Sequence, residues 1–331
     1  MLRPKALIFA AALCGSSASM SSPGEPPPDP QAPYLGNDTV EELTAEELAL
    51  RRDRYERLTI PVTIQGQGPY RFLIDTGAQV TVLSHRVVEE LQIEPTGQAT
   101  LVAMGSQQTV DTFDLDGLEF ANRSFSGLMA PLLHSHHIGA DGILGLDSLQ
   151  GLRVLIDFEE GRMDVADAET LGGNSGYEIV VRARRRLGQM IITDAKIDGV
   201  KTAVIIDTGA QNTIANPVLR KRLRRRDEGH QAYSTDVLGV EMATNVVVAK
   251  RLAIGRMELN NVPLGYAQSP VFASLGLDKR PALILGMRNM RIFRRVAIDF
   301  ASQRVLFDLP RDAYRKELGR QISNPSLIGS I

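Results

Sequence analysis

Short apolar runs separated by turn residues characterise most of the chain from residue 59 onward. Runs rich in β-branched residues alternate with Gly, Asn and Asp, which is the pattern of strands joined by tight turns. The clearest of these runs are Thr59–Ile64, Gly68–Ile74, Ala99–Val102 and Val246–Ile254. Two stretches, His85–Leu91 and Pro217–Arg226, favour short helices instead. The pattern therefore predicts a mainly β protein with little helix.

The same order of apolar motifs occurs twice. Residues 72–83 read FLIDTGAQVTVL and residues 204–215 read VIIDTGAQNTIA, so Asp-Thr-Gly-Ala-Gln-x-Thr follows an apolar run in both. Further along, GILGL at 142–146 is matched by LILGM at 283–287, and VLIDF at 154–158 by VAIDF at 296–300. Three landmarks in the same order indicate a duplicated domain. We expect a first lobe at residues 58–170 and a second at residues 171–309, joined by a glycine-rich linker at 172–176.

Each Asp-Thr-Gly places a carboxylate on a tight turn at the end of an apolar strand. A pseudo-two-fold axis between the duplicated units would bring Asp75 and Asp207 together. Two carboxylates a few ångströms apart share a proton, and their apparent pKa values separate. The ionised member can take a proton from a water, while the protonated member hydrogen-bonds a carbonyl oxygen. A pair of this kind can carry out general acid–base hydrolysis without a covalent intermediate.

On these motifs the sequence resembles the pepsin/retropepsin superfamily of aspartic proteases, over roughly residues 58–309. Each lobe has the family's apolar-apolar-Asp-Thr-Gly-Ala signature and a later apolar-apolar-Gly. The lobes are shorter than those of pepsin, and Ala78 and Ala210 match the retroviral form. The resemblance implies two retropepsin-like lobes fused in one chain, related by a pseudo-two-fold axis with a cleft between them. Intramolecular pairing of the lobes would make the protein a monomer.

The resemblance also implies roles for particular residues. The catalytic residues would be Asp75 and Asp207. Residues that support the pair would be Thr76, Gly77, Thr208 and Gly209. The glycines of the apolar-apolar-Gly segments, which cross the Asp-Thr-Gly loops in a ψ shape, would be Gly145 and Gly286.

Members of that family close β-hairpin flaps over an extended peptide substrate. By position, the flaps are expected at residues 102–109 and 237–244, with Gly105 and Gly239 at their tips. Ordinary hairpins at these places are the alternative. The sequence has no tyrosine near Met104 that would match the flap tyrosine of pepsins. An extended peptide would place alternate side chains in pockets of the cleft.

The N-terminus has the order of a secretory signal peptide. Arg3 and Lys5 precede the apolar run Ala6–Leu13, and small residues favour cleavage after Ala18. Lipidation of Cys14 and a buried N-terminal helix are the alternatives. We therefore expect export to the periplasm or the extracellular space, or a lipid anchor.

Residues 19–57 predict a Pro-rich spacer followed by an amphipathic helix, which could mask the cleft. Residues 310–331 predict a loose C-terminal tail. No chemistry is visible in either segment.

Charge is distributed unevenly between the two lobes. Residues 58–170 carry 5 basic and 16 acidic side chains, whereas residues 171–309 carry 22 basic and 12 acidic ones. Two basic runs, Arg182–Arg186 and Arg220–Arg226, account for much of the excess. Attraction between the lobes, contact with an acidic protein, and contact with an anionic membrane surface are three interpretations. Nucleic acid is disfavoured because neither run has flanking aromatic residues.

Other chemistries lack their motifs. The sequence has no phosphate-binding loop, no zinc-protease motif and no serine nucleophile elbow, and its single cysteine excludes disulfides and multi-cysteine metal sites. We interpret the cluster of His134, His136 and His137 as a solvated loop, and we expect no metal and no cofactor. The sequence favours an exported aspartic endopeptidase. A catalytically silent peptide-binding protein of the cell envelope and a structural scaffold are the alternatives.

Overall fold

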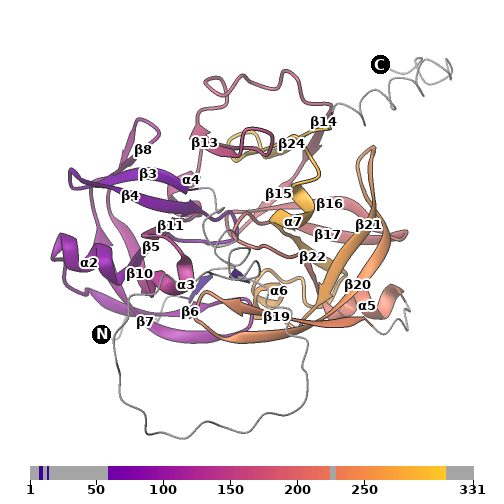
Figure 1. The fold of residues 1–331 in the computed structure, drawn as a ribbon, viewed down its shortest axis with the longest axis horizontal. Helices are drawn as coiled ribbons and strands as arrows, with labels where there is room; N and C mark the ends of the chain where they lie inside the picture. The colour runs from indigo at the N-terminus through magenta and orange to yellow at the C-terminus, as the bar shows by residue number, and fades with distance from the viewer. Residues whose placement is uncertain (1–6, 10–12, 15–58, 224–228, 311–331) are drawn as a thin grey trace, which may run out of the picture.

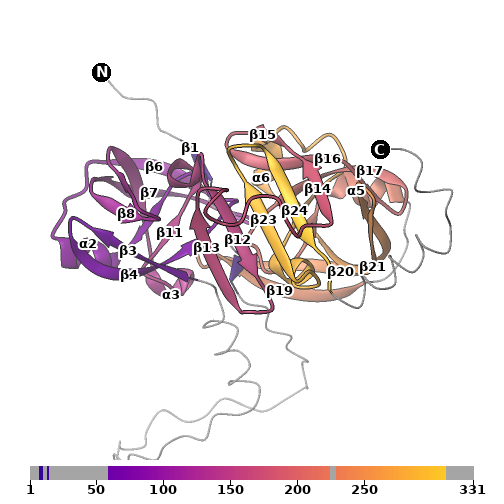
Figure 2. The same ribbon diagram turned by 90° about the horizontal axis from the view of Figure 1, so that it is seen from above.

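Two β lobes lie side by side and share a third sheet between them (Figure 1, Figure 2). The computed structural model describes residues 7–9, 13–14, 59–223 and 229–310. The first lobe is built on a ten-stranded sheet, the second on a nine-stranded sheet, and five strands form the shared sheet. The prediction of a mainly β, two-lobed fold is confirmed.

The first lobe follows the expected sequence of hairpins. At the first hairpin, Gln65 and Gly66 have φ of 52° and 74°, the left-handed geometry that lets a tight turn match the twist of its strands. The elements of this lobe are β3 (Thr59–Ile64), β4 (Gln67–Ile74), β5 (Val82–Ser84), α2 (His85–Leu91), β6 (Gly97–Val102), β7 (Gln107–Leu115), β8 (Leu118–Phe120), β9 (Arg123–Phe125), β10 (Leu128–Leu133), α3 (Ser135–Ile138), β11 (Gly142–Leu144) and α4 (Leu146–Leu149).

The second lobe repeats this order with longer flanking strands. Its elements are β15 (Arg184–Arg186), β16 (Gln189–Ile197), β17 (Val200–Ile206), β18 (Ile214–Ala215), α5 (Pro217–Leu223), β19 (His230–Asp236), β20 (Glu241–Ile254), β21 (Met257–Tyr266), α6 (Pro270–Ser274), β22 (Ala282–Leu285) and α7 (Met287–Met290). The helix predicted at residues 217–226 is observed as far as Leu223, and residues 224–228 lie outside the described residues.

The third repeated motif forms the centre of the shared sheet. This sheet contains β12 (Arg153–Asp157), β13 (Arg162–Ala166), β14 (Ile179–Arg182), β23 (Arg295–Asp299) and β24 (Arg304–Asp308). Strands β12 and β23, which carry the VLID and VAID sequences, pair antiparallel with Leu155 opposite Ala297 at the centre. Each lobe thus supplies one copy of the same motif to the β12–β23 pair. A pseudo-two-fold axis that passes between Leu155 and Ala297 would relate the two strands in this way.

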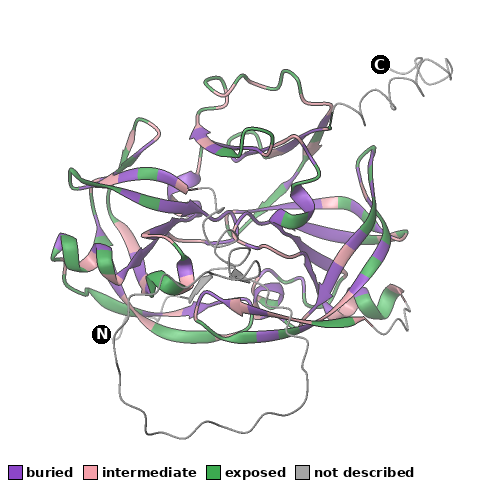
Figure 3. Cartoon of the chain, in the orientation of Figure 1, coloured by how far each residue is buried: buried purple, intermediate pink, exposed green. Residues whose placement is uncertain are grey.

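Burial follows the strand pattern of the sequence. The ends of β4 and β17 are apolar on both faces, because other strands lie beside them and side chains cover both faces of the sheet. Figure 3 shows buried residues along the central strands of both lobes and exposed residues on the outer loops and on α2 and α5. Within the described residues, no helix has the length and apolar character needed to cross a membrane.

Two short strands of the N-terminal segment add to the edges of the two lobes. Strand β1 (Leu7–Phe9) pairs parallel with β6, and β2 (Leu13–Cys14) pairs antiparallel with β19. The predicted cleavage site after Ala18, the spacer, the amphipathic helix and nearly all of the C-terminal tail lie outside the described residues.

Candidate active site

Both predicted carboxylates lie at the end of a buried parallel strand pair. Asp75 follows β4, which pairs in parallel with β11, and Asp207 follows β17, which pairs in parallel with β22. The backbone N–H of Asp75 donates to the Leu144 carbonyl at 3.1 Å, and that of Asp207 donates to the Leu285 carbonyl at 3.2 Å. The two loops therefore have the same position relative to the apolar-apolar-Gly segments.

Gly145 and Gly286 lie where two chain segments cross. A Cβ on Gly145 would come within 2.3 Å of the Val80 carbonyl, and one on Gly286 within 2.5 Å of the Asn212 carbonyl oxygen. Real Cβ contacts are essentially never that short, so only glycine fits without displacement of the backbone. This is the ψ-shaped crossing that the resemblance implied for these positions.

A symmetric set of hydrogen bonds joins the two loops beneath the carboxylates. The Thr76 hydroxyl donates to the Ile206 carbonyl at 3.0 Å and accepts from the Thr208 N–H at 3.1 Å. In return, the Thr208 hydroxyl donates to the Ile74 carbonyl at 2.7 Å and accepts from the Thr76 N–H at 3.0 Å. Four buried hydrogen bonds thus fix each Asp-Thr-Gly loop against the other lobe.

The two carboxyl groups meet at this contact. A Cβ on Gly209 would lie 2.3 Å from the Asp75 carboxyl carbon, so the Asp75 side chain rests against the second loop. The side chains of Asp75 and Asp207 are almost completely buried. Burial, then the charge of Asp75 and a hydrogen bond to it, raise the pKa of Asp207 well above its usual range. The pair can therefore keep one proton at a pH where an isolated aspartic acid would be ionised.

Backbone N–H groups hold each carboxyl group in place. One carboxyl oxygen of Asp75 accepts from the N–H groups of Gly77 at 2.7 Å and Ala78 at 3.1 Å. The corresponding donors to Asp207 are the N–H groups of Gly209 at 2.9 Å and Ala210 at 3.1 Å. These donors fix the orientation of the pair and stabilise its remaining negative charge.

Sequence reasoning missed three supporting positions. Thr81 donates through its hydroxyl to Asp147 at 2.8 Å, and Thr213 donates to the Asn289 amide oxygen at 2.8 Å. The signal was present, because both repeats end in this threonine. Gln189 of the second lobe, which is buried, donates to the Gly77 carbonyl at 2.6 Å. Gln189 lies outside the repeated motifs, and the sequence carried no signal for it.

Hairpins occupy both positions where flaps were predicted. The first joins β6 to β7 and has Gly105 in its turn, and the second joins β19 to β20 and has Gly239 in its turn. In Figure 1 these hairpins run along the bottom of the molecule, on the side away from β13, β14 and β24. The dyad loops therefore lie between the shared sheet and the two hairpins.

The histidine cluster forms a short helix instead of the predicted loop. His134 stacks on His85 with ring centroids 4.3 Å apart, and the rings of His136 and His137 lie 4.0 Å apart. Burial, then the neighbouring His136 and His134, lower the pKa of His137, so its ring is neutral near pH 7. Across the described ranges, no group of three or more His, Cys, Asp or Glu side chains is arranged to hold a metal ion.

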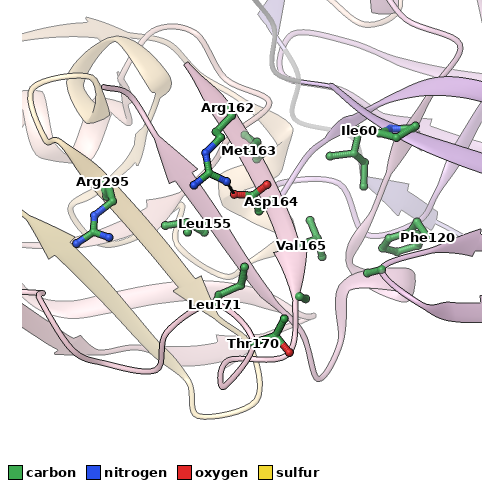
Figure 4. Close-up of a pocket in the computed structure, with 13 residues that line it drawn as sticks. Ile60, Phe120, Leu155, Arg162, Met163, Asp164, Val165, Thr170, Leu171 and Arg295 are labelled. Atoms are coloured by element: carbon green, nitrogen blue, oxygen red, sulfur yellow. Dashed lines mark hydrogen bonds and ion pairs between the residues drawn. The ribbon is translucent and has the colours of Figure 1, made fainter. Parts of the chain in front are cut away.

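A separate hollow of about 640 Å³ lies beside the shared sheet (Figure 4). Its walls come from the first lobe, from β12 and β13 and from Arg295 of β23, and two of the lining residues, Arg162 and Asp164, form an ion pair. Neither dyad residue lines it. It is therefore distinct from the candidate active site.

Both lobes match known protein families. The family described as "gag-polyprotein putative aspartyl protease" matches residues 60–151, and the family described as aspartyl protease matches residues 193–288. A solved retropepsin-like aspartic protease from Rickettsia conorii is 22% identical, with a TM-score of 0.30, over 40% of this chain and 89% of its own. No curated protein sequence matches. Each lobe thus matches an aspartyl protease family model, and we conclude that the chain consists of two aspartyl protease domains in one polypeptide.

Proposed function

We propose that the protein is an exported aspartic endopeptidase that hydrolyses peptide bonds with a water activated between Asp75 and Asp207. The observation that carries the proposal is the meeting of these two buried carboxyl groups on loops that each lobe supplies in the same way. No other pair of carboxyl groups within the described residues has this symmetric support.

The geometry suits a pair that shares one proton. Burial raises the pKa of Asp207 most, and repulsion between two full negative charges in this site raises it further. With one proton on the pair, the ionised carboxylate takes a proton from the attacking water. The protonated carboxyl donates to the carbonyl oxygen of the scissile bond while the water oxygen bonds to the carbonyl carbon. Collapse of this tetrahedral intermediate breaks the C–N bond, and the leaving amine takes a proton from the carboxyl pair. The backbone donors to Asp75 and Asp207 keep both groups oriented throughout.

The hairpin edges support an extended peptide as the substrate. Each edge already accepts a strand of this chain, since Leu7–Phe9 pairs with β6 and Leu13–Cys14 pairs with β19. The first pairing is parallel and the second antiparallel. A two-fold axis reverses the direction of a strand that crosses it at a right angle. Such a strand therefore runs parallel to the edge of one hairpin and antiparallel to the related edge of the other. A peptide substrate would take the same path and hydrogen-bond to both hairpins.

Export is the part of the proposal that rests on sequence alone. Cleavage after Ala18 would remove β1 and β2 together and leave both hairpin edges open to substrate. Release to the periplasm or the extracellular space follows, whereas lipidation at Cys14 would retain the protein on a membrane. The basic second lobe would then be available to an acidic protein or an anionic surface.

The test is cleavage of a peptide library and a denatured protein between pH 3 and 7 by residues 19–331, with pepstatin as a probe. Asp75→Asn and Asp207→Asn are measured beside the wild type. We expect a bell-shaped pH profile, because one carboxyl must be ionised and the other protonated. Either substitution should lower the rate by roughly 10²–10⁴-fold.

The outcome also separates the alternative function. Three folded proteins that bind the same peptides without cleavage would favour a catalytically silent peptide-binding protein. The full chain serves as a further comparison. It should bind peptides more weakly than residues 19–331, because β1 and β2 occupy the hairpin edges.

A further inference from the structure

One buried carboxylate joins the two flap hairpins. Asp236 is the last residue of β19 and is completely buried. One of its carboxyl oxygens accepts from the N–H groups of Leu238 and Val240, both at 3.0 Å, within its own turn. The other oxygen accepts from the Ser106 hydroxyl at 2.5 Å and the Gly105 N–H at 3.3 Å, both in the opposite hairpin. The carboxylate is thus shared between two flaps that belong to different lobes.

The flap tips cross at this link. Met104 of the first flap is fully buried in an apolar cluster whose other members, among them Ala210 and Met242, belong to the second lobe. Val237 of the second flap is fully buried in a cluster of the first lobe that includes Ala78. Each tip is therefore buried in an apolar cluster of the other lobe, and the carboxylate of Asp236 hydrogen-bonds to both turns.

Both turn glycines are needed for this close approach. A Cβ on Gly105 would come within 2.3 Å of the Met242 side chain, and one on Gly239 within 2.5 Å of the His137 ring. Gly239 also has a φ of 82°, which other residues rarely adopt. The crossed arrangement therefore depends on these positions in the two turns.

Only the second hairpin supplies a carboxylate to this contact. The corresponding last residue of β6 is Val102, which has no polar side chain to offer the second flap. A buried charge is costly unless hydrogen bonds satisfy it, and charge-assisted bonds are stronger than neutral ones. The four hydrogen bonds of Asp236 satisfy its carboxylate and join the two turns, whereas Val102 can form no such bond.

We propose that Asp236 is a positioning residue that clasps the two flaps into a single lid over the dyad, through Ser106 and Gly105. The clasp acts on the substrate groove that we assigned under the proposed function, and it rests on that assignment. The position of Asp236 in the groove is consistent with this role, because Leu13 of β2 pairs with Asp236 itself. A peptide backbone that runs along β19 thus lies directly against the clasp.

Kinetics of the full chain test the clasp through Ser106→Ala, which removes the cross-flap hydroxyl and leaves the turn of Asp236 intact. We expect KM to rise about tenfold, the factor that loss of one charge-assisted hydrogen bond corresponds to, with kcat nearly unchanged. Ser124→Ala, at the exposed position of β9, is the matched control. Asp236→Asn should also raise KM, and the double variant should be little worse than Asp236→Asn alone. A wild-type KM in Ser106→Ala, or fully additive effects, would overturn the clasp.

A distance measurement tests the clasp without turnover. Spin labels at Gln108→Cys and Glu241→Cys, in a full chain carrying Cys14→Ser, report the separation of the two flaps. We expect a narrow distance distribution that broadens when Ser106→Ala is added. Broadening in a protein that cleaves nothing would support the clasp and refute the proposed function. An unchanged narrow distribution would refute the clasp even in an active protease.

Discussion

In the first lobe the crossing of the two chain segments is supported by the carboxylate of Asp147, whereas in the second lobe the amide oxygen of Asn289 takes its place. Both accept from the threonine that ends the repeated motif. Burial raises the pKa of Asp147, although hydrogen bonds from Thr81 act in the opposite direction. An acceptor oxygen at this position is therefore required in both lobes, but a charge is not.

The two hairpins and the surfaces differ far more between the lobes than the loops around Asp75 and Asp207. The β19–β20 hairpin contributes Asp236 to the contact between the hairpins, and the β6–β7 hairpin has no counterpart. The first lobe has an excess of acidic side chains and the second an excess of basic ones. The symmetric part of the molecule holds the carboxyl pair, and the asymmetric part lies where a substrate or partner would bind.

The largest difference between the lobes in the effect of a substitution on stability is expected at two arginines of the shared sheet. Arg153 forms an ion pair with Asp299 at 2.6 Å, and both side chains are almost fully buried. Arg153→Ala should lower the free energy of unfolding by about 3 kcal/mol or more, because it leaves a buried carboxylate without its partner. Urea unfolding gives this value directly.

The pseudo-symmetric residue Arg295 is the matched control. Its side chain is 26% exposed, and Asp308, its partner at 2.7 Å, keeps a second ion pair with Arg294. Arg295→Ala should therefore cost only about 1 kcal/mol. Equal losses in the two variants would show that burial of the Arg153 pair is not what distinguishes them.

The threonines beneath the dyad should behave alike. Thr76→Ala and Thr208→Ala each remove a hydroxyl that both donates and accepts across the lobes, so each should cost roughly 1–3 kcal/mol. The double variant should cost less than the sum, since each hydroxyl accepts from the other residue's backbone N–H. Full additivity in unfolding experiments would mean that the two loops are held independently.

A smaller effect on stability is expected from the carboxyl pair, and this effect depends on pH. Because the folded-state pKa of Asp207 is raised, its contribution to stability is present at low pH and is lost as pH rises through that pKa. Asp207→Asn does not titrate and avoids this loss. Its Tm relative to wild type should increase between pH 4 and pH 7 by about 3 °C, the change that roughly 1 kcal/mol produces. Asp194→Asn, at a highly exposed position, should show no such trend.

The parts of the site that could be predicted from sequence are those that occur in both copies of the duplicated unit. The Asp-Thr-Gly loops and the crossing glycines recur in both halves, and the hairpins follow from their order between motifs. Gln189 and Asp236 each act across the lobes from one copy only, so no internal comparison could reveal them. Their roles depend on which strands meet at the interface, which is a property of packing rather than of local pattern.

The smallest expected effect on stability comes from the opposite net charges of the two lobes. If they attract each other across the interface, salt should lower the Tm, because charges separated by more than about 8–10 Å are largely screened near 0.1 M salt. The buried Arg153–Asp299 pair is shielded from solvent and should contribute little to this dependence. We therefore expect a Tm that falls modestly between about 0.02 and 0.5 M salt, over which the Debye length shortens from roughly 20 Å to about 4 Å. A Tm that stays constant or rises would mean that the charge asymmetry serves an external partner, and binding of the basic lobe to anionic vesicles would then be measured.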